Sequence, residues 1–341
     1  MTDSSLWSIL EICIRAIGRA VAQSGSALRW GCRGREFKSR RPDQFNLMSK
    51  KPKIGWVGLG VMGTPMVLNL LNAGHSVSVF SRTKSKAATV LEAGAQWMDD
   101  LSELAGDNDM VCMMVGYPED VEEVMLNKNG VLKNMKQGGL VIDFTTSSPE
   151  LAERIAEVAS GMNVLSLDAP VSGGDVGARD GTLAIMCGGE EKAFERAEPI
   201  LQKLGDKIRY FGGPGSGQRV KMSNQILIAS TMVGLVESMI YAERAGMEVS
   251  KVIDLIGKGA AGCWSINQLG PRILKGDWKP GFYIKHFLKD MRIAIEDSER
   301  MGLELEGLTL AKKLYSMTEA YDFEKDGTQA LMKILRSLNP I

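Results

Sequence analysis

IGWVGLGVMGTPMVLNLL, residues Ile54–Leu71, is the stretch of sequence that decides the fold. It runs from an apolar segment through a glycine-rich turn into residues with apolar positions at helical spacing. A strand, a tight turn and a helix start in this order are typical of a dinucleotide-binding fold, in which glycines allow the turn, the approach of a pyrophosphate and close helix packing. Free N–H groups at the helix start favour the phosphates. We expect the turn to bind the cofactor through Gly58, Leu59, Gly60, Val61, Met62 and Gly63.

The length and charge of the chain limit the classes of protein it can belong to. With 341 residues it can hold two domains and a substantial core. Lysine plus arginine and aspartate plus glutamate both number 41, so no net field favours nucleic acid or a membrane as a partner. Since no run of about 18 uncharged apolar residues occurs, we expect no membrane-spanning helix.

The cysteines indicate a reducing compartment. They lie far apart, with neither CxxC nor metal-ligand spacing, at Cys13, Cys32, Cys112, Cys187 and Cys263. Cys112 and Cys187 fall in apolar expected strands, where a buried thiol serves as a small hydrophobic group. We therefore expect a cytoplasmic protein without a metal site.

Residues 1–47 differ from the rest of the chain. They are basic between Arg29 and Arg41 and show little apolar periodicity. A disordered basic leader fits this composition, and so does a transit peptide, because transit peptides are rich in arginine. The stretch Gln23–Gln44 also resembles a transfer-RNA gene translated by mistake, and Met48 precedes the first strand as a true start would. We favour a mis-called start, with residues 1–47 unfolded.

Strands and helices alternate in the first half of the chain. The expected strands are Ile54–Gly58, Ser76–Phe80, Met110–Val115, Leu140–Asp143, Val164–Asp168, Leu183–Cys187 and Ile208–Phe211, with helices at Lys84–Ala93, Glu119–Leu126, Pro149–Ser160 and Glu191–Leu204. This alternation predicts a parallel sheet covered by helices on both faces. After the glycine-rich run Gly212–Gly217 the sequence is helical only, and its first helix, Gln218 to Ala245, is apolar or small on nearly all faces and should be buried.

The fold class is therefore α/β with two domains. We expect a Rossmann domain that binds the dinucleotide over residues 48–212, followed by an all-α domain over residues 213–341. The active cleft should lie between the two domains.

The end of the second expected strand indicates the cofactor. An NAD-specific Rossmann unit places Asp or Glu there to bond the ribose 2′-hydroxyl, whereas this chain has Ser81, Arg82 and Thr83. Arg82 can fork onto a 2′-phosphate, and Ser81 and Thr83 can donate hydrogen bonds to it. Alternatively, Arg82 is an ordinary solvated charge at the start of a helix and has no role in binding the cofactor. We expect NADP, with NAD as the second possibility.

Two later segments carry candidate chemistry. Ser172-Gly173-Gly174 follows a strand and can turn backbone N–H groups toward a carboxylate, although a plain turn would have the same glycines. Lys221 lies near the start of the long apolar helix, where a lysine is costly without a role or partner. Desolvation should lower its pKa and suit it to proton transfer, the alternative being a side chain that extends to solvent. Asn224 and Gln225 share its helix face.

A third segment, IKHFLKD, places His286, Lys289 and Asp290 on one helical face. The chain has two histidines, so no serine-type triad fits, and no His, Cys and Asp cluster has metal-ligand spacing. We interpret Asp290 as an orienting or ion-pairing group rather than as a base.

Four motifs together carry a resemblance to a known family. GLGVMGTPM, DAPVSGGDVGARDGTLAIMCGG, GSGQRVKMSNQ and KHFLKD occur in this order. From Lys53 to about Pro340 the chain resembles the β-hydroxyacid dehydrogenase family, which includes 3-hydroxyisobutyrate dehydrogenase and tartronate semialdehyde reductases. Two departures are Asn224-Gln225, where many members have Asn-Asn, and Val115-Gly116, where Leu-Pro is usual.

The resemblance implies roles for individual residues. Lys221 is then the catalytic lysine, and Ser172-Gly173-Gly174 binds the substrate carboxylate. Either Asn224 or Gln225 positions the substrate. Thr146 and Lys289 are implied as contacts of the cofactor, Thr146 on its nicotinamide half.

The implied reaction is hydride transfer between nicotinamide C4 and the oxygen-bearing β carbon of a small carboxylate, with semialdehyde reduction as the expected direction when NADPH is the partner. One alternative is an imine reductase of similar fold, which commonly lacks a lysine at the Lys221 place. Another is a non-catalytic nucleotide-binding module, against which Lys221 and an intact Ser172-Gly173-Gly174 loop both argue. The apolar helices and symmetry base rates predict a homodimer or homotetramer.

Overall fold

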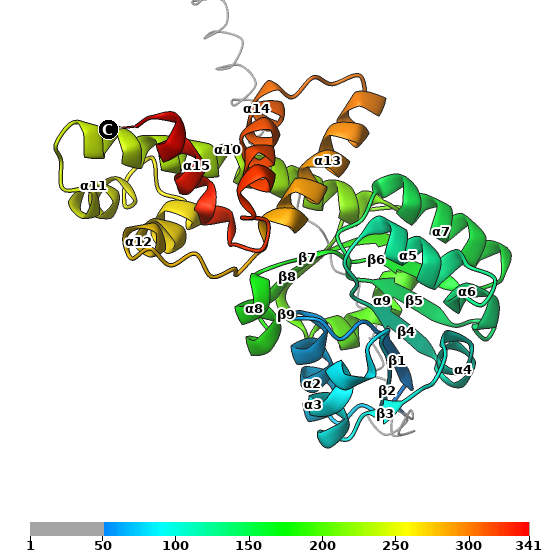
Figure 1. Ribbon diagram of the computed structural model, residues 1–341. Coiled ribbons are helices and arrows are strands. Elements are labelled where there is room, and N and C mark those ends of the chain that lie inside the picture. Colours follow the sequence, from blue (N-terminus) through cyan, green and yellow to red (C-terminus); the bar gives the residue numbers. More distant parts are fainter. Residues whose placement is uncertain (1–50, 341) are drawn as a thin grey trace, which may run out of the picture. The chain divides into compact units, whose positions relative to one another are not determined.

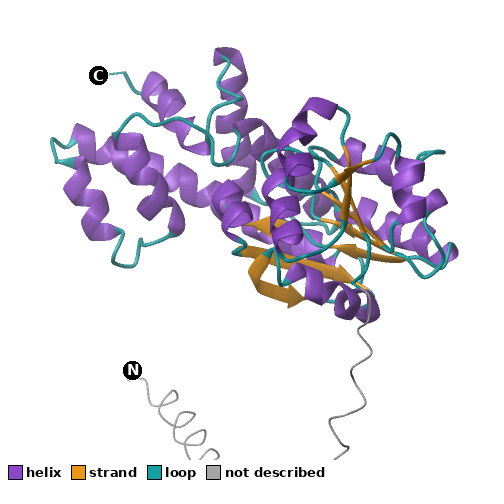
Figure 2. Ribbon diagram, turned by 90° about the horizontal axis from the view of Figure 1, so that it is seen from below, coloured by secondary structure: helices purple, strands orange, loops and turns teal. Residues whose placement is uncertain are grey.

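The computed structural model describes residues 51–340 (Figure 1). The basic leader expected over residues 1–47 therefore lies outside the described residues. Strands gather in the N-terminal part of the described chain, and the C-terminal part contains helices (Figure 2).

The N-terminal part is built on one mixed β-sheet. Its strands are β1 (Ile54–Val57), β2 (Val77–Phe80), β3 (Gln96–Trp97), β4 (Met110–Met113), β5 (Leu140–Asp143), β6 (Leu165–Asp168), β7 (Val171–Ser172), β8 (Leu183–Gly189) and β9 (Gly205–Tyr210). The strand order is β3-β2-β1-β4-β5-β6-β8-β7, and β9 also pairs with β8. From β3 to β6 all pairs are parallel, as expected for a Rossmann domain.

The expectation of a wholly parallel sheet is wrong at the far edge. There β8 runs antiparallel to both β6 and β7. Only about ten residues separate β7 from β8, and a parallel neighbour needs a crossover of about a dozen or more. The chain therefore turns back, and the stretch expected to be a loop holds the short strand β7 and the helix α8 (Gly174–Asp180).

Helices cover both faces of the sheet, as predicted. One face packs against α2 (Gly63–Asn72), α3 (Ala88–Glu92), α8 and α9 (Glu191–Leu201). The other packs against α4 (Leu101–Asp107), α5 (Pro118–Leu126), α6 (Val131–Asn134) and α7 (Pro149–Gly161). Strands β1, β4 and β5 are buried along their whole length, so their sequences are continuous apolar runs.

Two local expectations need correction. The helix expected at Lys84–Ala93 begins as a 3₁₀ turn over Lys84–Ala87 and continues as α3. Helix α4 was not expected, although Asp100 supplies its signal: the Asp100 carboxylate accepts a 2.8 Å hydrogen bond from Glu103 N, which caps the helix start.

The C-terminal part has a core of its own around one long helix. Its helices are α10 (Ser216–Arg244), α11 (Val249–Ile256), α12 (Gly270–Leu274), α13 (Ile284–Arg300), α14 (Glu306–Ser316) and α15 (Leu331–Leu338). Helix α10 packs against α13, α14 and α15, and against β8 of the sheet. Met232 and Val236 of α10 meet Phe287 and Met291 of α13 in this core.

Helix α10 is less enclosed than its sequence predicts. One stripe along it is exposed, and Leu227 and Tyr241 on that stripe are 66% and 73% exposed. By length and composition α10 could also cross a membrane, a property that the sequence expectation missed. Core helices share this property, and α10 packs against helices and sheet within the described chain.

The turn between β1 and α2 explains the spacing of its glycines. Gly58 has φ +97°, and a Cβ there would collide with the Met114 carbonyl. A Cβ on Gly63 would collide with the carbonyl oxygen of Gly58. A Cβ on Gly60 would meet nothing within 4 Å. Two of the glycines are thus required by the fold itself, and the third faces open space.

We expect Gly63→Ala to lower the free energy of unfolding by about 1–3 kcal/mol, because the added methyl forces the turn and helix apart. The matched variant Gly60→Ala should change that free energy by less than about 0.5 kcal/mol. Urea unfolding of both variants at one pH measures the difference. Equal losses would show that Gly63 does not set the helix-to-strand distance.

Candidate active site

Lys221 lies in the second turn of α10, with 6% of its surface exposed. Burial lowers the pKa of its ammonium group from 10.5 to about 8; nearby Asp290 opposes this shift, and Lys289 adds to it. An amine with this pKa is mostly protonated at pH 7 and can also lose its proton near neutrality. The lowered pKa agrees with the effect of desolvation expected from the sequence, and the side chain does not extend into solvent.

A continuous chain of polar contacts runs beside Lys221 from one half of the protein to the other. Asn224 Nδ2 donates to Gln225 Oε1 at 2.7 Å, and Gln225 Nε2 donates to Asp290 Oδ2 at 2.6 Å. The second carboxylate oxygen of Asp290 lies 3.1 Å from Lys289 Nζ, an ion pair without good hydrogen-bond geometry. Lys289 Nζ in turn donates to the backbone carbonyl of Thr146, beyond β5. Asp290 is thus an ion-pairing group, as its sequence position suggested.

The two adjacent amides differ in how much of their hydrogen-bonding capacity is used. Gln225 is 2% exposed, and both ends of its carboxamide have protein partners. Asn224 is half-buried and uses its NH₂ group on Gln225. The carboxamide oxygen of Asn224 is therefore better placed than either end of the Gln225 amide to meet a small molecule.

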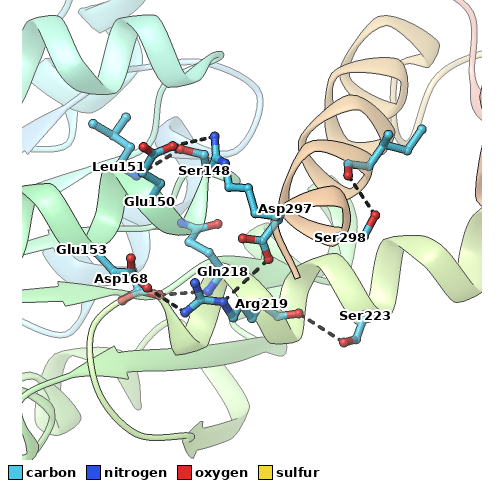
Figure 3. A network of polar contacts seen from close by, with 12 residues as sticks. Ser148, Glu150, Leu151, Glu153, Asp168, Gln218, Arg219, Ser223, Asp297 and Ser298 are labelled. Carbon is cyan, nitrogen blue, oxygen red and sulfur yellow. Dashed lines mark hydrogen bonds and ion pairs between the residues drawn. The ribbon is translucent and has the colours of Figure 1, made fainter. Parts of the chain in front are cut away.

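The start of α10 is fixed to the ends of β5 and β6. The Asp168 carboxylate accepts from Gly215 N at 2.8 Å and from Gln218 N at 2.9 Å. The Gln218 amide donates to Thr145 O at 2.8 Å and accepts from Ser147 N at 3.0 Å. Figure 3 shows Asp168 and Gln218 side by side at this junction. These contacts set where Lys221 lies.

A second set of contacts at this junction uses charged side chains. Arg219 lies 2.7 Å from Glu153 of α7 and 3.6 Å from Asp297 of α13, so one guanidinium joins both halves (Figure 3).

Burial raises the pKa of Asp168 to about 6 and that of Asp143, its neighbour on the adjacent strand, to about 7. Asp168 and Gln218 were not among the site residues predicted from the sequence. A signal was present, since an acid at the end of an apolar strand enters a glycine-rich segment.

Ser172-Gly173-Gly174 joins β7 to α8. Both glycines have positive φ, 134° and 64°, which disfavours other residues. Within residues 51–340 their N–H groups donate to no backbone carbonyl, so they are available to an anion. A Cβ on Gly174 would lie 3.6 Å from the carbonyl oxygen of Gly281, which places a loop of the helical part beside this turn.

His286 is held in an aromatic cluster rather than in the polar chain. Its ring centroid lies 5.4 Å from that of Tyr117, which directly precedes α5, and 6.5 Å from that of Phe282. Burial and the charges of Lys289 and Lys285 lower the pKa of the imidazole to about 4. His286 is therefore neutral at pH 7 and contributes packing across the two halves.

The glycine turn of β1 and α2 fits a dinucleotide. The open space beside Gly60 leaves room for a ligand to approach the backbone. Helix α2 starts there with no side-chain cap and no acid in its first turn, so the positive end of its dipole is open to a phosphate. Beyond β2, Arg82 is exposed and lies 2.8 Å from Asp120 of α5, while Thr83 is exposed and Ser81 half-buried.

Comparison with known proteins identifies both parts of the chain. Residues 53–212 match the NAD binding domain of 6-phosphogluconate dehydrogenase, and residues 215–335 match the NAD-binding domain of NADP-dependent 3-hydroxyisobutyrate dehydrogenase. The chain is 51% identical to an uncharacterized oxidoreductase of Bacillus subtilis, over 83% of this chain and 99% of the relative. It is 49% identical to a probable mitochondrial 3-hydroxyisobutyrate dehydrogenase-like protein of Arabidopsis thaliana, over 85% and 86%.

Solved structures agree with these relatives. Mycobacterium tuberculosis 3-hydroxyisobutyrate dehydrogenase with L-serine has a TM-score of 0.78 and 30% identity, covering 84% of this chain and 99% of that one. Imine reductases also resemble the chain, with TM-scores of 0.55 to 0.58 and 16–18% identity. At that identity the likeness shows a common fold alone.

We expect Lys221→Met to raise the free energy of unfolding at pH 7 by about 1–3 kcal/mol, because the folded state no longer desolvates an ammonium group. The folded pKa of Lys221 is lowered from 10.5 to about 8, so the burial penalty is present in full below pH 8 and is relieved as the pH rises toward 10.5. Denaturant unfolding at pH 7 and pH 10 should therefore show a gain that shrinks at the higher pH. Lys258→Met, at an exposed lysine just after α11, is the control, with a change of less than about 0.5 kcal/mol.

Proposed function

The chain belongs to the 3-hydroxyisobutyrate dehydrogenase family of NAD(P)-dependent oxidoreductases acting on hydroxyacids, and we propose that it interconverts a small β-hydroxy carboxylate and its semialdehyde. The nicotinamide cofactor supplies or accepts the hydride. Lys221 carries this proposal: it is a buried lysine of lowered pKa, and it lies at the junction of a dinucleotide-binding part and a helical part.

Lys221 is the proton donor and acceptor in this proposal. In the direction of reduction its ammonium group gives a proton to the oxygen that becomes the hydroxyl, and in oxidation the neutral amine takes that proton back. A pKa of about 8 supports both directions near neutral pH. Asn224 would accept a hydrogen bond from the hydroxyl group of the hydroxyacid through its carboxamide oxygen, and Gln225 would hold Asn224 in place by its link to Asp290.

The substrate class follows from the anion site. The N–H groups of Gly173 and Gly174, with the Ser172 hydroxyl, would hold the carboxylate and fix which face of the β carbon meets the nicotinamide ring. Family members are named for 3-hydroxyisobutyrate, and the Mycobacterium tuberculosis enzyme was solved with L-serine. Both compounds are carboxylates with a primary alcohol at the β carbon, which supports this class as the substrate.

The cofactor would be NADP rather than NAD. Arg82 stands where NAD-specific domains have an acid, and Ser81 and Thr83 lie beside it to bond a 2′-phosphate. The glycine turn from Gly58 to Gly63 would hold the pyrophosphate. Thr146, whose carbonyl accepts from Lys289, would contact the nicotinamide half. A cytoplasmic location is our inference from the free buried thiols of Cys112 and Cys187.

We also propose that the enzyme is a homodimer or homotetramer associated through the helical part. The exposed stripe on α10 includes Leu227 and Tyr241, large apolar groups that a second copy would cover. Sedimentation at micromolar concentration should give a species of at least two chains, and Leu227→Asp should shift it toward one. A wild-type protein that sediments as one chain would contradict the proposal.

We expect Lys221→Met to lower kcat by a factor of about 10²–10⁴, the usual contribution of a general acid or base. NADPH affinity should stay within about threefold of wild type. Lys221→Arg should lose nearly as much kcat, because a guanidinium keeps its proton. The assay is a panel of small semialdehydes and β-hydroxyacids with NADPH and NADH, beside a direct NADPH titration. Loss of activity through lost NADPH binding alone would make Lys221 a cofactor contact.

A further inference from the structure

Arg82 is not a free cation in the structure. Its guanidinium Nη1 lies 2.8 Å from Asp120 Oδ1, and the two side chains differ in exposure: Arg82 is 76% exposed, whereas Asp120 is 16% exposed. Asp120 lies in the first turn of α5, where the helix N-terminus stabilises a carboxylate. The acid is therefore held in place, and the arginine is the partner that can move.

The ion pair spans the carboxyl end of β1. Strands β2 and β4 flank β1 on its two sides, so residues that follow β2 and β4 face each other across the glycine turn. Gly58 N donates to Phe80 O at the end of β2, and Met114 N donates to Val57 O beside β4. Arg82 lies two residues after Phe80, and Asp120 lies in α5, which follows the loop after β4. The ribose of a dinucleotide binds at this end of the second strand.

We propose that Asp120 is the counter-ion that a 2′-phosphate displaces from Arg82, and that it thereby limits how strongly the enzyme prefers NADPH over NADH. This inference rests on the proposed role of Arg82. One guanidinium serves two anions in turn, and the fixed carboxylate of Asp120 also repels the incoming phosphate. NADH, with a 2′-hydroxyl, neither needs the arginine nor meets this repulsion.

The test is a direct measurement of Kd for NADPH and NADH by nucleotide fluorescence on the purified full chain. Asp120→Asn keeps the shape of the side chain and removes its charge. It should tighten NADPH about two- to fivefold, the range of an exposed ion pair, and leave NADH within about 1.5-fold. The gain should shrink when KCl rises from about 20 mM to about 300 mM, because salt screens exposed charges.

Glu119 provides a matched control in the same helical turn. It lies 3.6 Å from Arg292 and is 71% exposed, so Glu119→Gln makes the same charge change without touching Arg82. It should leave the NADPH to NADH affinity ratio within about 1.5-fold of wild type. A gain equal to that of Asp120→Asn would mean that net charge, not the ion pair, sets the ratio, and would overturn the inference.

Arg82→Ala separates this inference from the proposed cofactor preference. It should weaken NADPH binding about tenfold or more. In the Arg82→Ala background, the effect of Asp120→Asn on the logarithm of the NADPH Kd should fall to half or less of its effect in the wild-type background. Unchanged or weaker NADPH binding in Asp120→Asn, with the Arg82→Ala loss intact, overturns the role of Asp120 and leaves the preference for NADP standing. An Arg82→Ala variant that binds NADPH normally overturns both.

Discussion

The carboxylate of Asp168 is the constraint on which the arrangement of the site depends. It stands at the end of β6 and accepts backbone N–H groups from the start of α10, so it ends a strand of the sheet and caps a helix of the helical part. Gln218 adds two further bonds to the loop after β5. Because α10 is one rigid element, these contacts at its first turn determine where Lys221, Asn224 and Gln225 lie.

Several ionisable groups around this junction are buried, and burial of charge is unfavourable unless partners compensate. Asp290 and Lys289 compensate each other, while Lys221 and Asp143 respond instead through shifted pKa values. Replacing such groups by apolar ones commonly stabilises a protein. Packing alone would favour apolar residues at these positions. The buried ionisable groups therefore indicate a site that binds ligands or transfers protons.

Sequence patterns predicted the parallel core of the sheet well, because β1, β4 and β5 are continuous apolar runs between helical segments. They failed at the β7–β8 edge, where the two-residue strand β7 and the short helix α8 leave no periodicity to detect. The burial of Lys221 was predictable from an apolar helix. The partners of Gln225 and Arg82 were not, because they lie 65 and 38 positions away in the chain and depend on how helices pack on the sheet. Helical periodicity places residues on a face and does not say what the face meets.

The bond from Lys289 to the Thr146 carbonyl has a kinetic consequence. It joins a helix of the C-terminal part to a loop beyond β5, inside a region where Lys289 and Asp290 are almost fully buried. A hinge motion that broke this bond while the ammonium group stayed buried would leave the charge with fewer partners, which is unfavourable in a low-dielectric interior. The buried contact therefore restrains hinge motion between the two parts. We expect the exchange of ligands to proceed through smaller, local movements of the loops around the site.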